Sequence, residues 1–206
     1  MTIVGIDPSV TQTGVVAGRV GDPLEWTLVD TRPKRGQQKV AEPGRMSMIC
    51  EQVADFVDRT RPLIVDRPLL LVIEDYIGAR GYGLVNIGLH WLLRATVADA
   101  WSTETLVVAP ATLKLFATGK GNADKGTVGA CVQKRWGECL PREPTDEHVL
   151  DALALWELGR CWAERGEGDW TQYQRDAALR GGKRGERVAL ADTDSIIAAR
   201  GHVWTT

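Results

Sequence analysis

Two short apolar segments of the chain, residues 3–6 and 69–73, each end directly in a carboxylate. The first reads Ile-Val-Gly-Ile before Asp7, and the second reads Leu-Leu-Leu-Val-Ile before Glu74. Short runs that are apolar on both faces are typical of strands buried in the middle of a parallel sheet. Because the carboxyl ends of parallel strands share one edge, we expect Asp7 and Glu74 to lie side by side where open α/β sheets bind ligands.

The remaining pattern predicts one α/β domain followed by a tail. A three-strand meander is followed by helices that alternate with strands, which predicts a mixed five-stranded sheet flanked by helices. We expect residues 1–165 to form this domain and the polar, Gly- and Arg-rich residues 166–206 to form a partly ordered tail with one short helix. Besides the two segments above, strands are predicted at 13–20, 26–31 and 105–109, and helices at 43–60, 85–101, 111–116, 125–136 and 146–165.

Composition limits the possible classes of protein. Of the 206 residues, 44% are hydrophobic, which argues against general disorder, and the formal net charge is −2, so nucleic-acid binding would depend on local basic clusters. The longest apolar run, residues 68–73, is too short to cross a membrane. No signal peptide is evident, and the four cysteines lack zinc-finger spacing. These features predict a soluble protein of the cytoplasm with no membrane partner.

A third element carries polar residues toward the same edge. The predicted helix at 146–165 begins Asp-Glu-His-Val-Leu-Asp, so that His148 and Asp151 share one helical face. If its first turn lies at the carboxyl edge of the sheet, these side chains meet Asp7 and Glu74. Each element alone also fits a structural role, because an acid at the start of a helix commonly caps it.

Three carboxylates held close together repel one another unless a cation neutralises them. Oxygen ligands without cysteine suit Mg²⁺ or Mn²⁺. Two such ions, roughly 3.5–4 Å apart, can clamp the attacking and leaving oxygens of a phosphodiester. The sequence therefore predicts a site for two Mg²⁺ ions, in which Mn²⁺ can substitute, and no nucleotide cofactor.

Taken in order, the motifs resemble those of the RuvC-type Holliday junction resolvases, in particular the phage-type members, within the RNase H-like superfamily. The resemblance covers roughly residues 1–165. It rests on four motifs: Gly-Ile-Asp7-Pro-Ser with Thr-Gly14; Val-Ile-Glu74-Asp-Tyr; Pro110-Ala-Thr-Leu-Lys114 with Gly-Lys-Gly-Asn-Ala-Asp-Lys125; and His148-Val-Leu-Asp151-Ala-Leu-Ala.

The resemblance implies an RNase H-like fold and a metal-dependent endonuclease that acts as a homodimer. Such an enzyme cuts two opposed strands of a four-way DNA junction during recombination, repair or phage DNA processing, in a bacterial cell or a phage-infected host. Asp7 would bridge both metals, and Glu74 and Asp151 would each help to hold one. His148 would ligate a metal or orient the attacking water, with Glu147 as the fallback.

The resemblance and the residues together indicate a set of DNA contacts. Lys125 and Lys114 match family lysines near the scissile phosphate, whereas Lys120 is interpreted as ordinary surface charge. In the family an aromatic residue after the strand acid often probes the junction centre, but this register places Ile77 there. The remaining candidates lie in two loops. The basic loop at 32–39 is either a solvated turn or a DNA contact, and the tyrosines of the Gly-rich loop at 78–83 and just before it either stack on bases or anchor that loop. The residues are Lys34, Arg35, Lys39, Tyr76, Arg80 and Tyr82.

Several alternative functions remain open from the sequence. A ribosomal-RNA-processing nuclease of the same fold is the nearest one, although such chains are usually shorter and lack the Gly-Asn-Ala-Asp-Lys125 pattern. A non-catalytic junction-binding protein is a further alternative, but such a protein would bind DNA phosphate better without negative charge beside it, and this chain keeps Asp7, Glu74 and Asp151. The opening also resembles the phosphate loop of sugar kinases and actin-like ATPases, but those proteins need two such domains around the nucleotide.

Overall fold

The computed structural model describes residues 1–33, 41–60, 69–75, 83–100, 103–141, 146–180 and 189–190. The central element is a mixed sheet with strand order β3-β2-β1-β4-β5-β6. β1 pairs antiparallel with β2, and β2 pairs antiparallel with β3, whereas β1, β4 and β5 are parallel to one another. The strands are β1 (Thr2–Asp7), β2 (Gln12–Arg19), β3 (Glu25–Asp30), β4 (Leu69–Glu74), β5 (Thr103–Val108) and β6 (Ala189–Leu190).

The five predicted strands are confirmed as β1–β5, and the sequence did not predict the sixth. β6 consists of two tail residues that pair antiparallel with Leu106 and Val107 of β5. β1 and β4 are buried almost throughout, as expected for the central strands of a covered sheet, whereas the edge strand β3 is largely half-buried or exposed.

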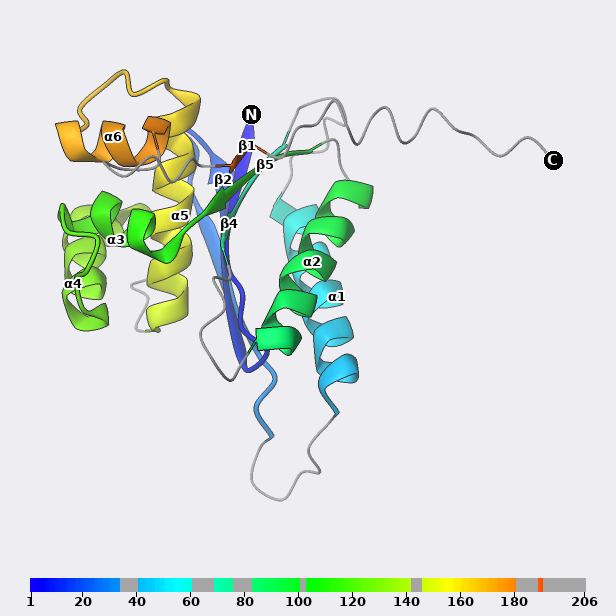
Figure 1. Cartoon of the computed structure of the whole chain (residues 1–206). Helices are drawn as coiled ribbons and strands as arrows, with labels where there is room; N and C mark the ends of the chain where they lie inside the picture. The colour runs from blue at the N-terminus through cyan, green and yellow to red at the C-terminus, as the bar shows by residue number, and fades with distance from the viewer. Residues whose placement is uncertain are drawn as a thin grey trace.

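Helices cover both faces of this sheet (Figure 1). Helices α1 and α2 pack on one face, and α3 to α6 pack on the other. The helices are α1 (Glu42–Thr60), α2 (Gly83–Ala100), α3 (Pro110–Thr118), α4 (Lys125–Trp136), α5 (Glu147–Ala163) and α6 (Gln172–Arg180), with a short 3₁₀ turn η1 (Gly137–Cys139) after α4.

Local sequence signals account for the helix boundaries on the α5 face. Pro110 occupies the first turn of α3, where its missing N–H costs nothing, and Gly119 ends that helix with a φ of 79°. The Asp124 side chain caps α4 by accepting a hydrogen bond from the Thr127 backbone N–H. The Asp146 side chain caps α5 by accepting one from the His148 backbone N–H.

The predicted tail contributes to the same layer. α6 packs against α3 and α5, and its Ala177 and Ala178 are buried in the core on that side. The domain boundary at residue 165 stays a prediction. Among the helices that the structure describes, none combines the length and apolar character of a membrane-spanning segment.

Candidate active site

Two carboxylates lie on neighbouring strands and on the same face of the sheet. In the parallel pairing of β1 with β4, Ile6 is opposite Ile73, so Asp7 and Glu74 are the next residues on each strand. Side chains alternate between the two faces along a strand. Ile3 of β1 and Val72 of β4 belong to the core on the α5 side, and this alternation places both acids on that side too.

Glycines allow α5 to approach the sheet closely at this edge. Gly14 is the direct partner of Asp7 in the antiparallel pairing of β1 with β2. A Cβ at position 14 would lie 2.0 Å from the His148 carbonyl oxygen, and one at position 5 would lie 2.3 Å from that of Ala152. A larger residue at either position would push the helix away. These glycines therefore let the first turns of α5 lie against β1, which carries Asp7, and its neighbour β2.

His148 is joined directly to Asp7 in this arrangement. Its Nδ1 lies 2.6 Å from Oδ2 of Asp7, and both side chains are largely buried. The backbone N–H of His148 donates to Asp146, which also accepts a hydrogen bond from Gln12 at 3.4 Å. The hydrogen bond to Asp7 raises the pKa of His148 against the opposing effect of burial, and the charges of Asp7 and Asp146 add to the increase.

Glu74 and Asp151 are partly buried, and both have raised pKa values. Burial raises the pKa of Glu74 well above its ordinary value, and the charges of Asp7 and Asp151 and a hydrogen bond with Asp7 raise it further. Burial followed by the charge of Asp7 raises the pKa of Asp151 to about 7. The three carboxylates therefore lie close enough to oppose one another's ionisation.

Lys125 is the cation beside these acids. Its positive charge lowers the pKa of both Glu74 and Asp151, but burial and the charges of the neighbouring acids raise these pKa values by more. Burial lowers the pKa of Lys125 itself, but its hydrogen bond to Glu147 and the charges of nearby acids produce a net increase. Lys125 Nζ lies 3.2 Å from Glu147 Oε1. The structure thus pairs Glu147 with a lysine.

The chemistry of the donor set fits a hard divalent cation. A cation would relieve the mutual repulsion that, after burial, raises the pKa of Glu74 and Asp151. Carboxylate oxygens with one imidazole suit Mg²⁺ or Mn²⁺. Within the described parts of the chain, however, no group of three or more His, Cys, Asp or Glu side chains is arranged to hold a metal ion as it stands. In this arrangement Asp7 is instead hydrogen-bonded to His148.

The structure brings together the five residues predicted as catalytic: Asp7, Glu74, Lys125, His148 and Asp151. Lys114 lies half-buried on α3. The other predicted DNA contacts lie outside the described residues: Lys34, Arg35, Lys39, Tyr76, Arg80 and Tyr82.

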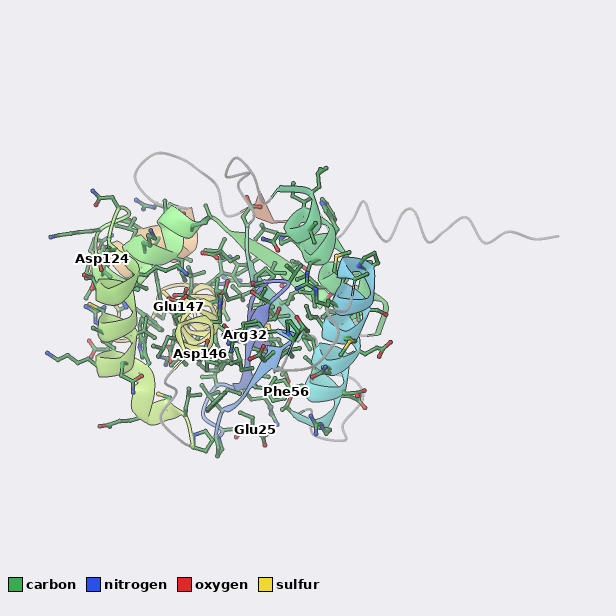
Figure 2. The ribbon with its side chains drawn as sticks, turned by 90° about the horizontal axis from the view of Figure 1, so that it is seen from below. Glu25, Arg32, Phe56, Asp124, Asp146 and Glu147 are labelled. Atoms are coloured by element: carbon green, nitrogen blue, oxygen red, sulfur yellow. The ribbon has the colours of Figure 1, made fainter. Side chains whose placement is uncertain are left out.

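Two further residues lie at the rim of this site: Gln12, which the sequence did not indicate, and Arg32, which the sequence indicated only as part of the basic loop at 32–39. Arg32 forms two-pronged hydrogen bonds with Asp30, and the negative charge of Asp146 also reaches it. Figure 2 looks onto this end of α5 and shows Asp146 and Glu147 there, with Arg32 beside them. Arg32 is the first residue of the basic loop at 32–39, and this cluster of positive charge was the sequence feature that indicated it. No sequence feature indicated Gln12.

Comparison with known proteins supports the resemblance inferred from the motifs. No family model matches the chain. The crossover junction endodeoxyribonuclease RuvC of Mycobacterium tuberculosis (strain ATCC 25177 / H37Ra) is 27% identical over 165 residues, which are 79% of this chain and 82% of that protein. The RuvC of Clavibacter sepedonicus is 29% identical over 156 residues, which are 75% of this chain and 72% of that protein.

Solved structures show the same fold. The Thermus thermophilus RuvC structure aligns with a TM-score of 0.58 at 23% identity, covering 81% of this chain and 97% of that one. The T. thermophilus RuvC in complex with a Holliday junction substrate aligns with a TM-score of 0.59 at 22% identity, covering 81% and 96%. The chain is therefore similar to the RuvC crossover junction endodeoxyribonucleases over most of its length, and it has the RNase H-like fold of RuvC.

Proposed function

We propose that this protein is a divalent-metal-dependent endonuclease that resolves four-way DNA junctions by paired cuts. The observation that carries the proposal is the meeting of Asp7, Glu74, His148 and Asp151 at one edge of a RuvC-like sheet. Two further facts support it: the curated relatives are named crossover junction endodeoxyribonucleases, and one similar structure contains a Holliday junction substrate. The ribosomal-RNA-processing alternative has no such support.

We propose that the same four side chains hold the metal, with Asp7 at the centre of the set. Two Mg²⁺ ions, or Mn²⁺ in their place, would supply Lewis acidity at the attacking water and at the scissile phosphate. His148 holds Asp7 in position through Nδ1, and Glu74 and Asp151 present partly buried carboxylates beside it. Lys125 places a positive charge where a phosphate approaches these acids.

Charge-neutral variants test this proposal. Asp7→Asn keeps the shape of the side chain but loses the charge needed beside two cations, so we expect cutting of a labelled four-way junction to fall by about three orders of magnitude or more. Glu74→Gln and Asp151→Asn should behave alike. His148→Ala should retain more activity, because water replaces a neutral ligand more easily than an anion.

Binding and cutting are measured on the same junction, duplex and flap substrates with Mg²⁺, Mn²⁺ or EDTA. Junction binding should survive in all four variants, and EDTA should abolish cutting. Glu25→Gln, which removes an exposed carboxylate from the edge strand β3, is the control and should cut normally. If folded Asp7→Asn cuts at a rate near that of the wild type, the metal-nuclease proposal is wrong and Asp7 is a structural residue.

We also propose that the protein acts as a homodimer, because two cuts on opposed strands require two sites. Apolar side chains remain exposed on the α1–α2 face of the single chain, including Leu84, Trp91 and Leu92 of α2. A second copy related by two-fold symmetry could cover them with the same surface.

A further inference from the structure

The ion pair between Lys125 and Glu147 lies at the rim of the acidic edge and is open to solvent. Nζ of Lys125 is 3.2 Å from Oε1 of Glu147, and the two side chains are 64% and 58% exposed. Lys125 is the first residue of α4 and Glu147 is the first residue of α5, so the pair joins the starts of two neighbouring helices. Figure 2 shows the start of each helix through the labels at Asp124 and Glu147.

This pair is not needed to hold the helices together. Each helix start is already fixed by its own cap, Asp124 for α4 and Asp146 for α5. The two helices also share a buried apolar contact, to which Val128 and Val149 belong. Exposed ion pairs add little to stability, because solvent screens them and two long side chains must be ordered. A role other than structural support is therefore more consistent with its position.

Lys125 also acts electrostatically on the acids of the site. The ammonium lies on the same end of α5 as the acids, beside Glu147, which directly precedes His148, and its charge lowers the pKa of Glu74 and Asp151. Arg32, which the charge of Asp146 reaches, is already engaged by two-pronged hydrogen bonds to Asp30. In the DNA-free protein, Glu147 thus occupies a lysine that DNA backbone would otherwise attract.

We propose that Glu147 is a specificity-determining residue that competes with DNA phosphate for the Lys125 ammonium. The inference rests on the proposed nuclease function. DNA that brings a phosphate close to the acidic edge exchanges one ion pair for another and releases Glu147. When the DNA backbone stays further from this edge, Lys125 remains paired with Glu147. The exposed Glu147 carboxylate then repels the phosphates, and the DNA binds more weakly. The carboxylate is stable in this place because the first turn of a helix favours negative charge.

Binding measurements on neutral variants test the competition. With EDTA present and at about 50 mM salt, Glu147→Gln should bind a labelled four-way junction about threefold to tenfold more tightly than the wild type, and the gain should shrink at higher salt. The gain should be larger for a matched duplex, so the ratio of duplex Kd to junction Kd should fall. Glu167→Gln removes an exposed carboxylate beyond the far end of α5 and serves as the charge-matched control.

A double-mutant cycle identifies the partner of Glu147. In a Lys125→Met background, Glu147→Gln should gain no more affinity than Glu167→Gln does, because no ammonium remains to be released. The inference is overturned if, in the wild-type background, Glu147→Gln increases junction affinity no more than Glu167→Gln does. It is equally overturned if the increase in affinity persists in the Lys125→Met background. It is also overturned if Glu147→Gln raises the Mg²⁺ concentration needed for half-maximal cutting, since that result would assign Glu147 to the metal. A wild-type protein that neither prefers nor cuts the junction would refute the proposed function itself.

Discussion

At the scale of single residues, the main feature is that the pKa values of the site carboxyls Glu74 and Asp151 are raised above their ordinary values. Burial and then the charge of Asp7 raise the pKa of Asp151 from an ordinary value of 3.8 to about 7. A carboxyl whose pKa rises on folding binds more protons in the folded than in the unfolded state. The free energy of unfolding therefore decreases as the pH rises from the unfolded-state pKa to the folded-state pKa. The raised pKa values of Glu74 and His148 act in the same direction.

We therefore expect the metal-free protein to be less stable at pH 7.5 than at pH 5.5. Thermal unfolding in EDTA should show the lower midpoint at the higher pH. Added Mg²⁺ should raise the midpoint mainly at pH 7.5, because the cation then replaces the proton as the neutralising charge. Asp151→Asn should reduce the difference between the two pH values, and a midpoint that rises with pH in EDTA would contradict this explanation.

At the scale of elements, the contact of α5 with β1 and β2 decides where the site lies. Gly14 contributes by lacking a side chain, since a Cβ there would meet the carbonyl oxygen and carbon of His148 at 2.0 and 2.3 Å. Gly14→Ala should force the first turn of α5 away from Asp7. The expected cost is about 1–3 kcal/mol in the free energy of unfolding, as for other overpacked contacts. Cutting should fall further than this loss explains, because the Asp7–His148 contact is disturbed.

The control for this change is a helical glycine with room for a methyl group. A Cβ at Gly129 of α4 would lie 3.5 Å from Leu150, an ordinary contact distance, so Gly129→Ala should stabilise the protein by up to about 1 kcal/mol. Chemical denaturation measures both variants, and junction cutting is assayed well below each unfolding midpoint. Equal stabilities for the two alanine variants would show that α5 can move without cost.

At the scale of the whole molecule, the two helical layers are unequally covered. The layer on the α5 face is closed by α6, whereas α2 exposes Trp91 and Leu92 by 59% and 44%. If a second copy covers this surface, Leu92→Glu should dissociate the dimer into monomers at micromolar concentration. The monomer should also nick junctions on one strand where the wild type makes paired cuts.

Sedimentation and a strand-resolved cutting assay measure these two effects together. Leu179→Glu places the same charge on an equally exposed leucine of α6, on the opposite layer, and should leave the dimer intact. A wild-type protein that sediments as a monomer at micromolar concentration would exclude the proposed dimer and with it the paired-cut mechanism.

The sequence alone determined the order of the elements and much of the site. Apolar periodicity distinguished strands from helices, because periods of two and of 3.6 place side chains on different faces. It also determined that Asp7 and Glu74 end parallel central strands, which fixes their proximity once β1 pairs with β4. The shared face of His148 and Asp151 followed from their spacing of three residues on a helix.

Only the tertiary structure decided the partners within the site and at the sheet edge. The pairing of His148 with Asp7 and of Glu147 with Lys125 depends on how closely α5 approaches β1, β2 and α4. Likewise, nothing in the tail sequence indicated that Ala189 and Leu190 would pair with β5. The physical reason is the same in each case: periodicity shows which face of an element is buried, but the distance between two elements depends on the side-chain volumes that other segments of the chain contribute to the contact.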